Sequence, residues 1–214
     1  MQTRQILYTL IFAGFFLTSS LIAQKADYRP GLFLREDWKE IPAELPVNQS
    51  HVANEDLLLH LYGPGKEFIK KSHHDKPADD PYYIWSGPCE GNWMVALEHK
   101  DAMADLTEYS RIRWRSKQAG LRELRLTLKL SDGTWLVSEE SDGPSGDWQI
   151  NEFIVSDLTW FELDPETILV KREAVEPDLS EVIQIGFTDL MRGGRSLACS
   201  RLDWIEVYGK KADK

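Results

Sequence analysis

Four leucines recur at every second position from Leu124 to Leu130, with Arg125, Thr127 and Lys129 between them. Successive side chains of a β-strand point to opposite faces, so this spacing places all four leucines on one face and the polar residues on the other. An amphipathic helix would instead repeat its apolar residues three and four positions apart. The alternation therefore predicts a strand with one face in the core and the other in water.

The same kind of pattern extends over most of the chain. Short runs rich in Val, Ile, Leu, Trp and Tyr are separated by Gly, Pro and Asp, which is typical of many short strands. A turn signal at 131–134 joins 124–130 to 135–137, and with 111–115 these segments predict three consecutive antiparallel strands. Further strands are predicted at 31–35, 57–62, 82–85, 93–98, 148–155, 182–188 and 202–208, and short helical turns at 37–45 and 162–167.

Length and composition limit the class of protein. The 214 residues include 25 Lys and Arg, 35 Asp and Glu, and 42% hydrophobic residues, which is ordinary for a globular chain. A net charge of −10 argues against a nucleic-acid partner, because binding phosphates requires a concentrated basic surface. No repeat or Gly/Ser linker divides the chain. We expect residues 24–214 to form a single all-β domain, a β-sandwich of two antiparallel sheets.

The first 23 residues have the layout of a secretory signal peptide. Arg4 precedes a long apolar run that ends in the small residue Ala23. The alternative is a retained membrane anchor, because the run is long enough to span a bilayer. The signal-peptide interpretation predicts a mature chain that begins at Gln24, is secreted or periplasmic, and has no membrane span.

The two cysteines, Cys89 and Cys199, lie far apart in the sequence. In an oxidising compartment they could form one disulfide, and as free thiols they would behave as small buried hydrophobic residues. Neither belongs to a CxxC motif, which argues against zinc or thioredoxin-type chemistry.

The order of these features resembles a known fold family. The strands at 112–114 and 124–130 are followed by Asp147-Trp148, by 156–158, by 182–187 and by the closing DWIEVYG segment at 203–209. This order resembles the galactose-binding-like jelly roll of many carbohydrate-binding modules, over roughly residues 90–209. The resemblance implies a jelly-roll sandwich and a polysaccharide ligand. A structural calcium is frequent in that superfamily, but no calcium ligands can be matched here residue by residue.

The segment from residue 70 to residue 85 concentrates side chains that could perform chemistry. Histidine and carboxylate groups can hold a metal, or act as acid and base in the cleavage of a glycosidic bond. The alternative is a solvated loop whose aspartates cap turns. Two adjacent histidines in an extended chain point to opposite sides, so only one is expected at a given site. The candidate residues are His73, His74, Asp79, Asp80, Tyr82, Tyr83 and Trp85.

A basic stripe is the second candidate for a ligand site. If Ile112 and Trp114 face the core together with the leucines, the residues between them share the outer face, and these are Arg111, Arg113, Arg115, Arg125 and Lys129. Such a stripe could receive uronic or sulfated sugars. The alternative is cross-strand pairing with Glu123 and other acids.

Two further features complete the candidate sites. Arg192 lies in a glycine-containing loop at 188–196, which is either a ligand contact or a plain turn. Eight tryptophans are available to stack on sugar rings. Trp114 and Trp204 fit the inward phase of their strands, whereas those near turns are better candidates for exposure, namely Trp85, Trp93, Trp135 and Trp148.

No HExxH motif, Walker loop, GxSxG elbow or dinucleotide fingerprint occurs in the chain. We therefore expect a secreted protein that binds carbohydrate, with an anionic polysaccharide as the finer prediction. The alternative is a small lyase or hydrolase that cleaves glycans on the same sandwich. A third hypothesis is a structural envelope protein with no small ligand.

Overall fold

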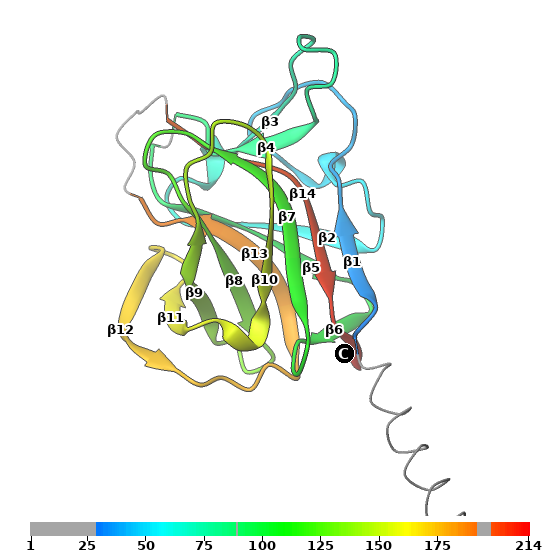
Figure 1. Ribbon diagram of the computed structural model, residues 1–214, viewed down its shortest axis with the longest axis vertical. Helices are drawn as coiled ribbons and strands as arrows, with labels where there is room; N and C mark the ends of the chain where they lie inside the picture. Colours follow the sequence, from blue (N-terminus) through cyan, green and yellow to red (C-terminus); the bar gives the residue numbers. More distant parts are fainter. Residues whose placement is uncertain (1–28, 89, 192–197) are drawn as a thin grey trace, which may run out of the picture.

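The computed structural model describes residues 29–88, 90–191 and 198–214, and in this part of the chain the alternating runs form strands (Figure 1). Three 3₁₀ helices accompany them, η1 (Gln49–His51), η2 (Lys66–Phe68) and η3 (Val155–Asp157). The strands are β1 (Leu32–Glu36), β2 (Leu57–Tyr62), β3 (Lys70–Ser72), β4 (Tyr83–Trp85), β5 (Trp93–His99), β6 (Ala102–Asp105), β7 (Arg111–Gln118), β8 (Leu124–Leu130), β9 (Trp135–Asp142), β10 (Gln149–Ile154), β11 (Trp160–Asp164), β12 (Leu169–Val175), β13 (Val182–Asp189), β14 (Ser200–Tyr208) and β15 (Lys210–Asp213).

The strands form two sheets. The six-stranded sheet has the order β10-β7-β14-β4-β3, and β1 also pairs with β14. The nine-stranded sheet has the order β12-β11-β9-β8-β13-β5-β2, with β6 pairing β13 and β15. Figure 1 shows β7 and β14 lying across the front of β8, β13 and β5. This arrangement confirms the predicted all-β sandwich of antiparallel sheets.

The core lies between the two sheets. Ile112 and Trp114 of β7 are fully buried, as are three of the four leucines of β8, and Leu130 is nearly so. The Trp114 and Phe187 rings meet edge to face with centroids 6.3 Å apart, which joins β7 of one sheet to β13 of the other. The burial of alternate residues in β7 and β8 follows the predicted phase.

A second cluster covers part of the outer face of the nine-stranded sheet. In β5, Val95 and Leu97 belong to the central core, whereas Met94 and Ala96 belong to the second cluster. Adjacent residues of a strand face opposite sides, so this sheet is covered on both faces at β5. Trp135 is 5% exposed within this second cluster.

Two expectations about the elements are wrong, and a third is confirmed only in part. Strands β7, β8 and β9 do not form one three-stranded unit, because β7 pairs with β10 and β14 in one sheet while β8 pairs with β9 in the other. The predicted helical turn at 37–45 is irregular chain with a β-bridge at Glu44. The turn predicted at 162–167 is partly confirmed: residues 162–164 belong to β11, and residues 165–168 form a turn in which the Ile168 N–H donates to the Asp164 carbonyl oxygen at 2.7 Å before β12 begins.

Candidate functional site

Strands β3 and β4 hold both ends of the 73–82 loop together. Ser72 pairs with Tyr83 in an antiparallel register, so the residues on either side of this pair face each other across the loop base. The His73 and Tyr82 rings stack with centroids 4.0 Å apart and planes 9° apart. The loop rises above one end of the sandwich (Figure 1).

The two histidines serve different surroundings, as the extended chain predicts. The Nδ1 atom of His74 lies 2.9 Å from Oδ2 of Asp80 and 3.2 Å from the Tyr83 hydroxyl. The same Asp80 oxygen accepts a hydrogen bond from the His74 backbone N–H. The His74 side chain is exposed, while His73 lines a hollow on the surface together with Tyr82. Only His73 is therefore placed to meet a ligand in that hollow.

The predicted basic stripe is divided between the two sheets. Arg111, Arg113 and Arg115 share the outer face of β7, as expected. Arg125 lies on β8 in the other sheet, where it bonds to Glu123 and to the Ser138 carbonyl oxygen. The prediction of one stripe was wrong at Arg125 and Lys129, which both lie on β8, because it assumed that β7 and β8 belong to the same sheet.

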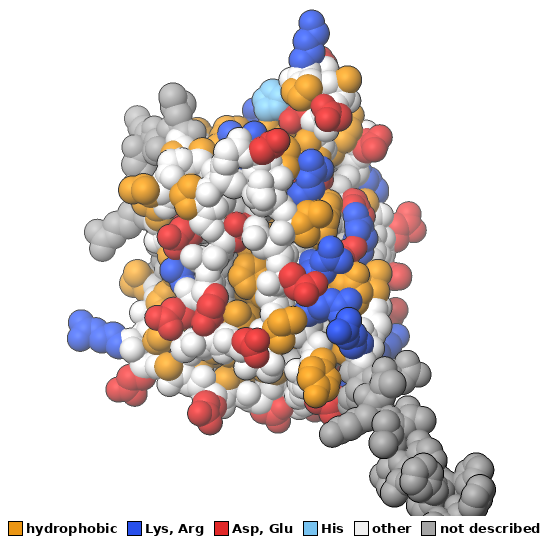
Figure 2. Space-filling view, in the orientation of Figure 1, with side chains coloured by type: hydrophobic (Ala, Val, Ile, Leu, Met, Phe, Trp, Pro, Cys, Tyr) orange, Lys and Arg blue, Asp and Glu red, His pale blue; other side chains and the backbone are white. Residues whose placement is uncertain are grey.

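Each arginine on the outer face of β7 has a carboxylate partner. Arg115 lies 2.8 Å from Asp203, and Arg113 lies within 3.5 Å of both Glu206 and Glu152. Arg111 lies 3.5 Å from Glu152. Figure 2 shows the basic side chains interleaved with acidic and apolar ones over this sheet. The outer face is therefore a set of ion pairs rather than a continuous basic patch.

Aromatic rings alternate with these arginines. Arg35 lies 4.8 Å from the centroid of the Trp204 ring and Arg113 lies 6.0 Å from it. Arg115 lies 5.4 Å from the Trp148 ring centroid. A guanidinium over an aromatic ring gains cation–π attraction, which holds both groups in place. The outer face is thus a preorganised surface of flat groups.

Trp204 faces outward, contrary to the prediction. The register of β14 with β7 shifts between Leu202 and Trp204. An extra residue at such a bulge reverses the phase of all residues that follow it, so Ile205 and Val207 take the inward positions. The expectation of exposure was also wrong for Trp93 and Trp135, which are buried, while Trp85 and Trp148 are partly exposed.

A hollow of about 580 Å³, here called the aromatic hollow, joins the two predicted sites. It combines the 73–82 loop with the start of the chain after β1, with β7 and with β14. Its walls are formed by Asp37, Trp38, Glu40, His73, Ala78, Asp79, Asp80, Pro81, Tyr82, Arg115, Asp203 and Trp204. Of the predicted site residues, it brings together His73, Asp79, Asp80, Tyr82 and Arg115.

Seven residues that line the aromatic hollow were not predicted as site residues: Asp37, Trp38, Glu40, Ala78, Pro81, Asp203 and Trp204. A sequence signal does exist, since Asp37-Trp38 and Asp203-Trp204 are both Asp-Trp pairs. A third pair, Asp147-Trp148, lies beside them through the contact of Trp148 with Arg115. The repeated dipeptide marks all three segments, but only the fold brings them together.

Burial alters two ionisable groups at this site. The Asp203 side chain is 10% exposed, and burial raises its pKa to about 6, although the adjacent Arg115 opposes the shift. Burial also lowers the pKa of Lys71 to about 8. The Lys71 ammonium lies 4.4 Å from the Tyr82 ring centroid. The site therefore contains a carboxyl group that can carry a proton near neutral pH.

Trp38 occupies an unusual position in the wall. Its φ of 56° lies in the left-handed region, which is costly for a bulky residue. The Glu36 carboxylate holds this conformation by accepting a hydrogen bond from the Trp38 backbone N–H at 2.7 Å. The indole Nε1 is buried and has no hydrogen-bond partner among the described residues.

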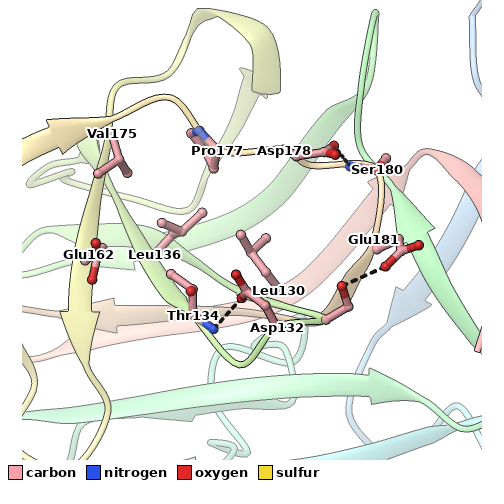
Figure 3. A pocket seen from close by; sticks show the side chains of 11 residues that line it. Leu130, Asp132, Thr134, Leu136, Glu162, Val175, Pro177, Asp178, Ser180 and Glu181 are labelled. Carbon is pink, nitrogen blue, oxygen red and sulfur yellow. Dashed lines mark hydrogen bonds between the residues drawn. The ribbon is translucent and has the colours of Figure 1, made fainter.

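A second hollow, here called the β12 hollow, has a volume of about 420 Å³ and a different chemistry (Figure 3). Asp132, Glu162, Asp178 and Glu181 surround an apolar floor. Hydrogen bonds within the walls occupy several of these groups, such as that from the Ser131 hydroxyl to Glu181 at 2.7 Å. None of its lining residues is aromatic, so it lacks the flat surface that a sugar ring would contact.

Several predicted features fall outside the described residues. Arg192, Cys89 and the signal segment at 1–23 all belong to this group, so their roles stay predictions. Within the described residues there is no helix long and apolar enough to cross a membrane. No cluster of three or more His, Cys, Asp or Glu side chains in this part of the chain could hold a metal ion.

Comparison with known proteins gives similarity of structure only. No family model and no curated protein matches the sequence. A family 11 carbohydrate-binding module of a Clostridium thermocellum cellulase matches 80% of this chain and 97% of its own, with 12% identity and a TM-score of 0.45. A family 29 module complexed with cellulohexaose matches 79% and 94%, with 13% identity and a TM-score of 0.45. An exo-β-agarase matches 75% of this chain and 24% of its own, with 9% identity and the same score.

The neighbours include carbohydrate-binding modules, the class whose jelly-roll fold the order of strands resembles. At such low scores and identities the likeness transfers no ligand to this chain. What the aromatic hollow can bind follows from its own residues.

Proposed function

We propose that this protein is secreted and binds carbohydrate, and that the aromatic hollow receives the sugar. The observation that carries the proposal is the joint placement of Trp204, Tyr82 and Arg115 with several carboxylates around one hollow of about 580 Å³. Sugar sites combine apolar ring surface with a few positioned polar groups. Of the aromatic hollow and the β12 hollow, only the aromatic hollow combines aromatic rings with polar side chains.

The ion pairs support recognition of hydroxyl groups. A sugar hydroxyl both donates and accepts a hydrogen bond, and an arginine–carboxylate pair such as Arg115–Asp203 presents donors and acceptors side by side. These side chains are already held by their partners and by the rings, so binding requires little further ordering. This preorganisation favours a neutral glycan.

An anionic glycan is the finer prediction from the sequence. It requires positive charge that is not already neutralised, and Arg111, Arg113 and Arg115 all have carboxylate partners. Uronic or sulfated sugars would have to displace these carboxylates or bind beside them. The test of the proposed function therefore includes uronic and sulfated polysaccharides beside the neutral ones.

Glycan cleavage is the second candidate function. Asp203 supports it, because a carboxyl group with a pKa of about 6 can donate a proton to a leaving oxygen near neutral pH. Asp37 and Asp79 line the same hollow and could supply the second carboxylate. In this case the hollow would release shorter sugars rather than retain long ones.

A polysaccharide panel tests both functions at once. The purified protein is incubated with neutral, uronic and sulfated polysaccharides, and both retention and the release of shorter products are recorded. Retention without products supports binding, and products lost in Asp203→Asn support cleavage. If no polysaccharide is retained or cleaved, the proposed function is wrong and the structural hypothesis gains.

A matched pair of variants locates the site. Trp204→Ala removes a ring from the aromatic hollow, and Trp85→Ala removes a partly exposed ring outside it. We expect Trp204→Ala to weaken retention about tenfold, the value of a ring contact near 1.4 kcal/mol. Equal effects of the two variants would place the sugar elsewhere.

Secretion has its own test. We propose that cleavage follows Ala23, so N-terminal sequencing of protein recovered from outside the cell should begin at Gln24. A chain that begins at Met1 and stays with the membrane fraction would establish the retained anchor instead.

A further inference from the structure

We infer that the aromatic hollow is one end of a longer binding surface, which follows β7 to a second hollow and takes a linear, neutral glycan several sugar units long. This inference rests on the proposed function and deepens it by naming the form of the ligand. It follows from the outer face of the six-stranded sheet, where side chains from neighbouring strands lie in rows.

The second hollow, here called the distal hollow, has a volume of about 280 Å³. Its lining residues are Arg29, Tyr109, Arg111, Glu152 and Ile154. The distal hollow therefore combines an aromatic ring with arginine donors and a carboxylate acceptor, as the aromatic hollow does.

Both hollows lie on the outer face of the same sheet. Arg115 lines the aromatic hollow and Arg111 lines the distal hollow, and residues an even number of positions apart in a strand share a face. Strands β7 and β14 run side by side away from the end that carries the 73–82 loop (Figure 1). At the rise of an antiparallel strand, the four positions from Arg111 to Arg115 span about 14 Å. This span exceeds one sugar ring, so only a chain of several units can reach both hollows.

The surface between the hollows alternates arginines with carboxylates. Arg113 lies 3.5 Å from Glu206 of β14 and 3.4 Å from Glu152 of β10. Arg35 of β1 also pairs with Glu206. These pairs present hydrogen-bond donors beside acceptors, which suits sugar hydroxyls. Two arginines and two carboxylates cancel in charge, so this part of the path favours a neutral chain.

Aromatic rings lie beside both ends of the path. In the register of β14 with β7, Trp204 is opposite Arg115 and Tyr208 is opposite Arg111. Side chains directly opposite each other in a sheet share a face, so both rings are on the outer face, where they are partly exposed. The Arg111 guanidinium lies 3.8 Å from the Tyr208 ring centroid, and this cation–π contact holds a donor at the distal hollow.

Tyr109 supplies an exposed ring on an anchored turn. It is 65% exposed, the largest exposed fraction of any aromatic residue in the described part of the chain. The Thr107 backbone N–H donates to the Asp105 carboxylate at 2.9 Å, and the buried Ser110 hydroxyl donates to the Thr107 carbonyl oxygen at 2.8 Å. These bonds fix the turn on both sides of Tyr109. The ring is therefore available to a sugar without further ordering of the backbone.

Titration calorimetry with oligomers of increasing length tests the inference. The probes are linear oligomers of two to six sugar units, prepared from the neutral polysaccharide that the protein retains. We expect the affinity to rise about tenfold or more from the shortest to the longest oligomer, because only the longer ones reach both hollows. An affinity that stops rising at two units would overturn the inference.

Three variants locate the two ends of the chain. Tyr109→Ala should weaken binding of the longest oligomer about tenfold, the value of a ring contact, and leave the shortest one that binds unchanged. Trp204→Ala should weaken both, because short and long oligomers share the aromatic hollow. Leu121→Ala is the control and should change neither, since Leu121 is 77% exposed and lines neither hollow.

The outcomes separate this inference from the proposed function. If Trp204→Ala weakens binding but Tyr109→Ala leaves the longest oligomer unchanged, the inference is wrong and sugar binding in the aromatic hollow stands. A loss in Tyr109→Ala alone would place the sugar in the distal hollow and contradict both. Retention of only uronic or sulfated polysaccharides would overturn the neutral ligand inferred here. Absence of binding to every polysaccharide would overturn the proposed function, and the inference with it.

Discussion

At the scale of single residues, the buried carboxylate of Glu36 organises the chain that leads into the aromatic hollow. Its two oxygens accept hydrogen bonds from the backbone N–H groups of Trp38, Ala53 and Asn54, at 2.7, 2.7 and 3.0 Å. Burial raises the pKa of Glu36, although these three donors pull it down. Three N–H groups that lack strand partners are satisfied by one side chain.

Glu36→Ala should lower the free energy of unfolding by about 3 kcal/mol, because it leaves several buried donors without an acceptor. Glu36→Gln, which keeps one carbonyl oxygen, should cost less. Urea unfolding followed by tryptophan fluorescence measures both. Glu55→Ala, at an exposed position, is the control and should change stability by less than about 0.5 kcal/mol. A loss no larger than that of Glu55→Ala would contradict the role given to Glu36.

Asp203 should make stability depend on pH. Its pKa rises from 3.8 to about 6 on folding, so the folded chain binds more protons between these values. The free energy of unfolding therefore falls as the pH rises through this window, and the stabilising contribution present at low pH is lost above about pH 6. The full contribution corresponds to about 3 kcal/mol, since one pKa unit corresponds to about 1.4 kcal/mol.

The variant Asp203→Asn removes this titration. Denaturant unfolding at several pH values from about 4 to about 7 should show the variant gaining stability relative to the wild type by about 2.4 kcal/mol across the series, since part of the full contribution is already lost at pH 4. Other carboxyl groups titrate in both proteins, so their effects cancel in the difference. A difference that stays constant with pH would show that Asp203 is not protonated near pH 6 in the fold.

Residue patterns predicted part of the site. His73, Asp79, Asp80 and Tyr82 were expected to act together because they are close in the sequence, and they do line one hollow. Asp203 was not predicted as a site residue. It lies more than 100 positions after the 73–82 loop in the sequence, so only the fold shows that the two are close in space. Its partner Arg115 was predicted only as a member of a stripe.

At the scale of strands, Gly186 permits the close approach of β13 to β5. It pairs with Ala96, and a Cβ atom at this position would lie 2.1 Å from the Val95 carbonyl oxygen. The backbone cannot yield to such a contact without shifting the strand.

Gly186→Ala should therefore destabilise the protein by about 3 kcal/mol, the upper end of overpacking in a core. Gly146→Ala is the matched control, because a Cβ atom there would meet nothing within 4 Å. Thermal unfolding of the two variants tests the difference. Equal melting temperatures would show that β13 and β5 have room to separate.

One of the strands that sequence patterns missed, β12, has no face in the core. All but the last residue of β12 are exposed, and the strand pairs on one side with β11. A strand with neither face in the core shows no alternation of apolar residues, so periodicity cannot reveal it. The opposite case is β7, whose strict alternation in sequence matches its alternate burial.

At the scale of the whole molecule, the sandwich places β14 close to both termini of the domain. Cys199 is buried immediately before β14, and Cys89 lies outside the described residues. The sequence leaves a disulfide and two thiols as equal alternatives. Intact mass in oxidising and reducing conditions should differ by two hydrogens if the disulfide forms, and identical masses would exclude it.

The sequence by itself determined the all-β class, most strand positions and the inward face of β7 and β8. Each of these depends on the burial of one side of a single strand, which local periodicity records. Only the tertiary structure decided which sheet each strand joins, the outward orientation of Trp204 and the union of four distant segments in the aromatic hollow. These depend on pairing between strands far apart in the chain and on a bulge in β14, and neither leaves a periodic trace.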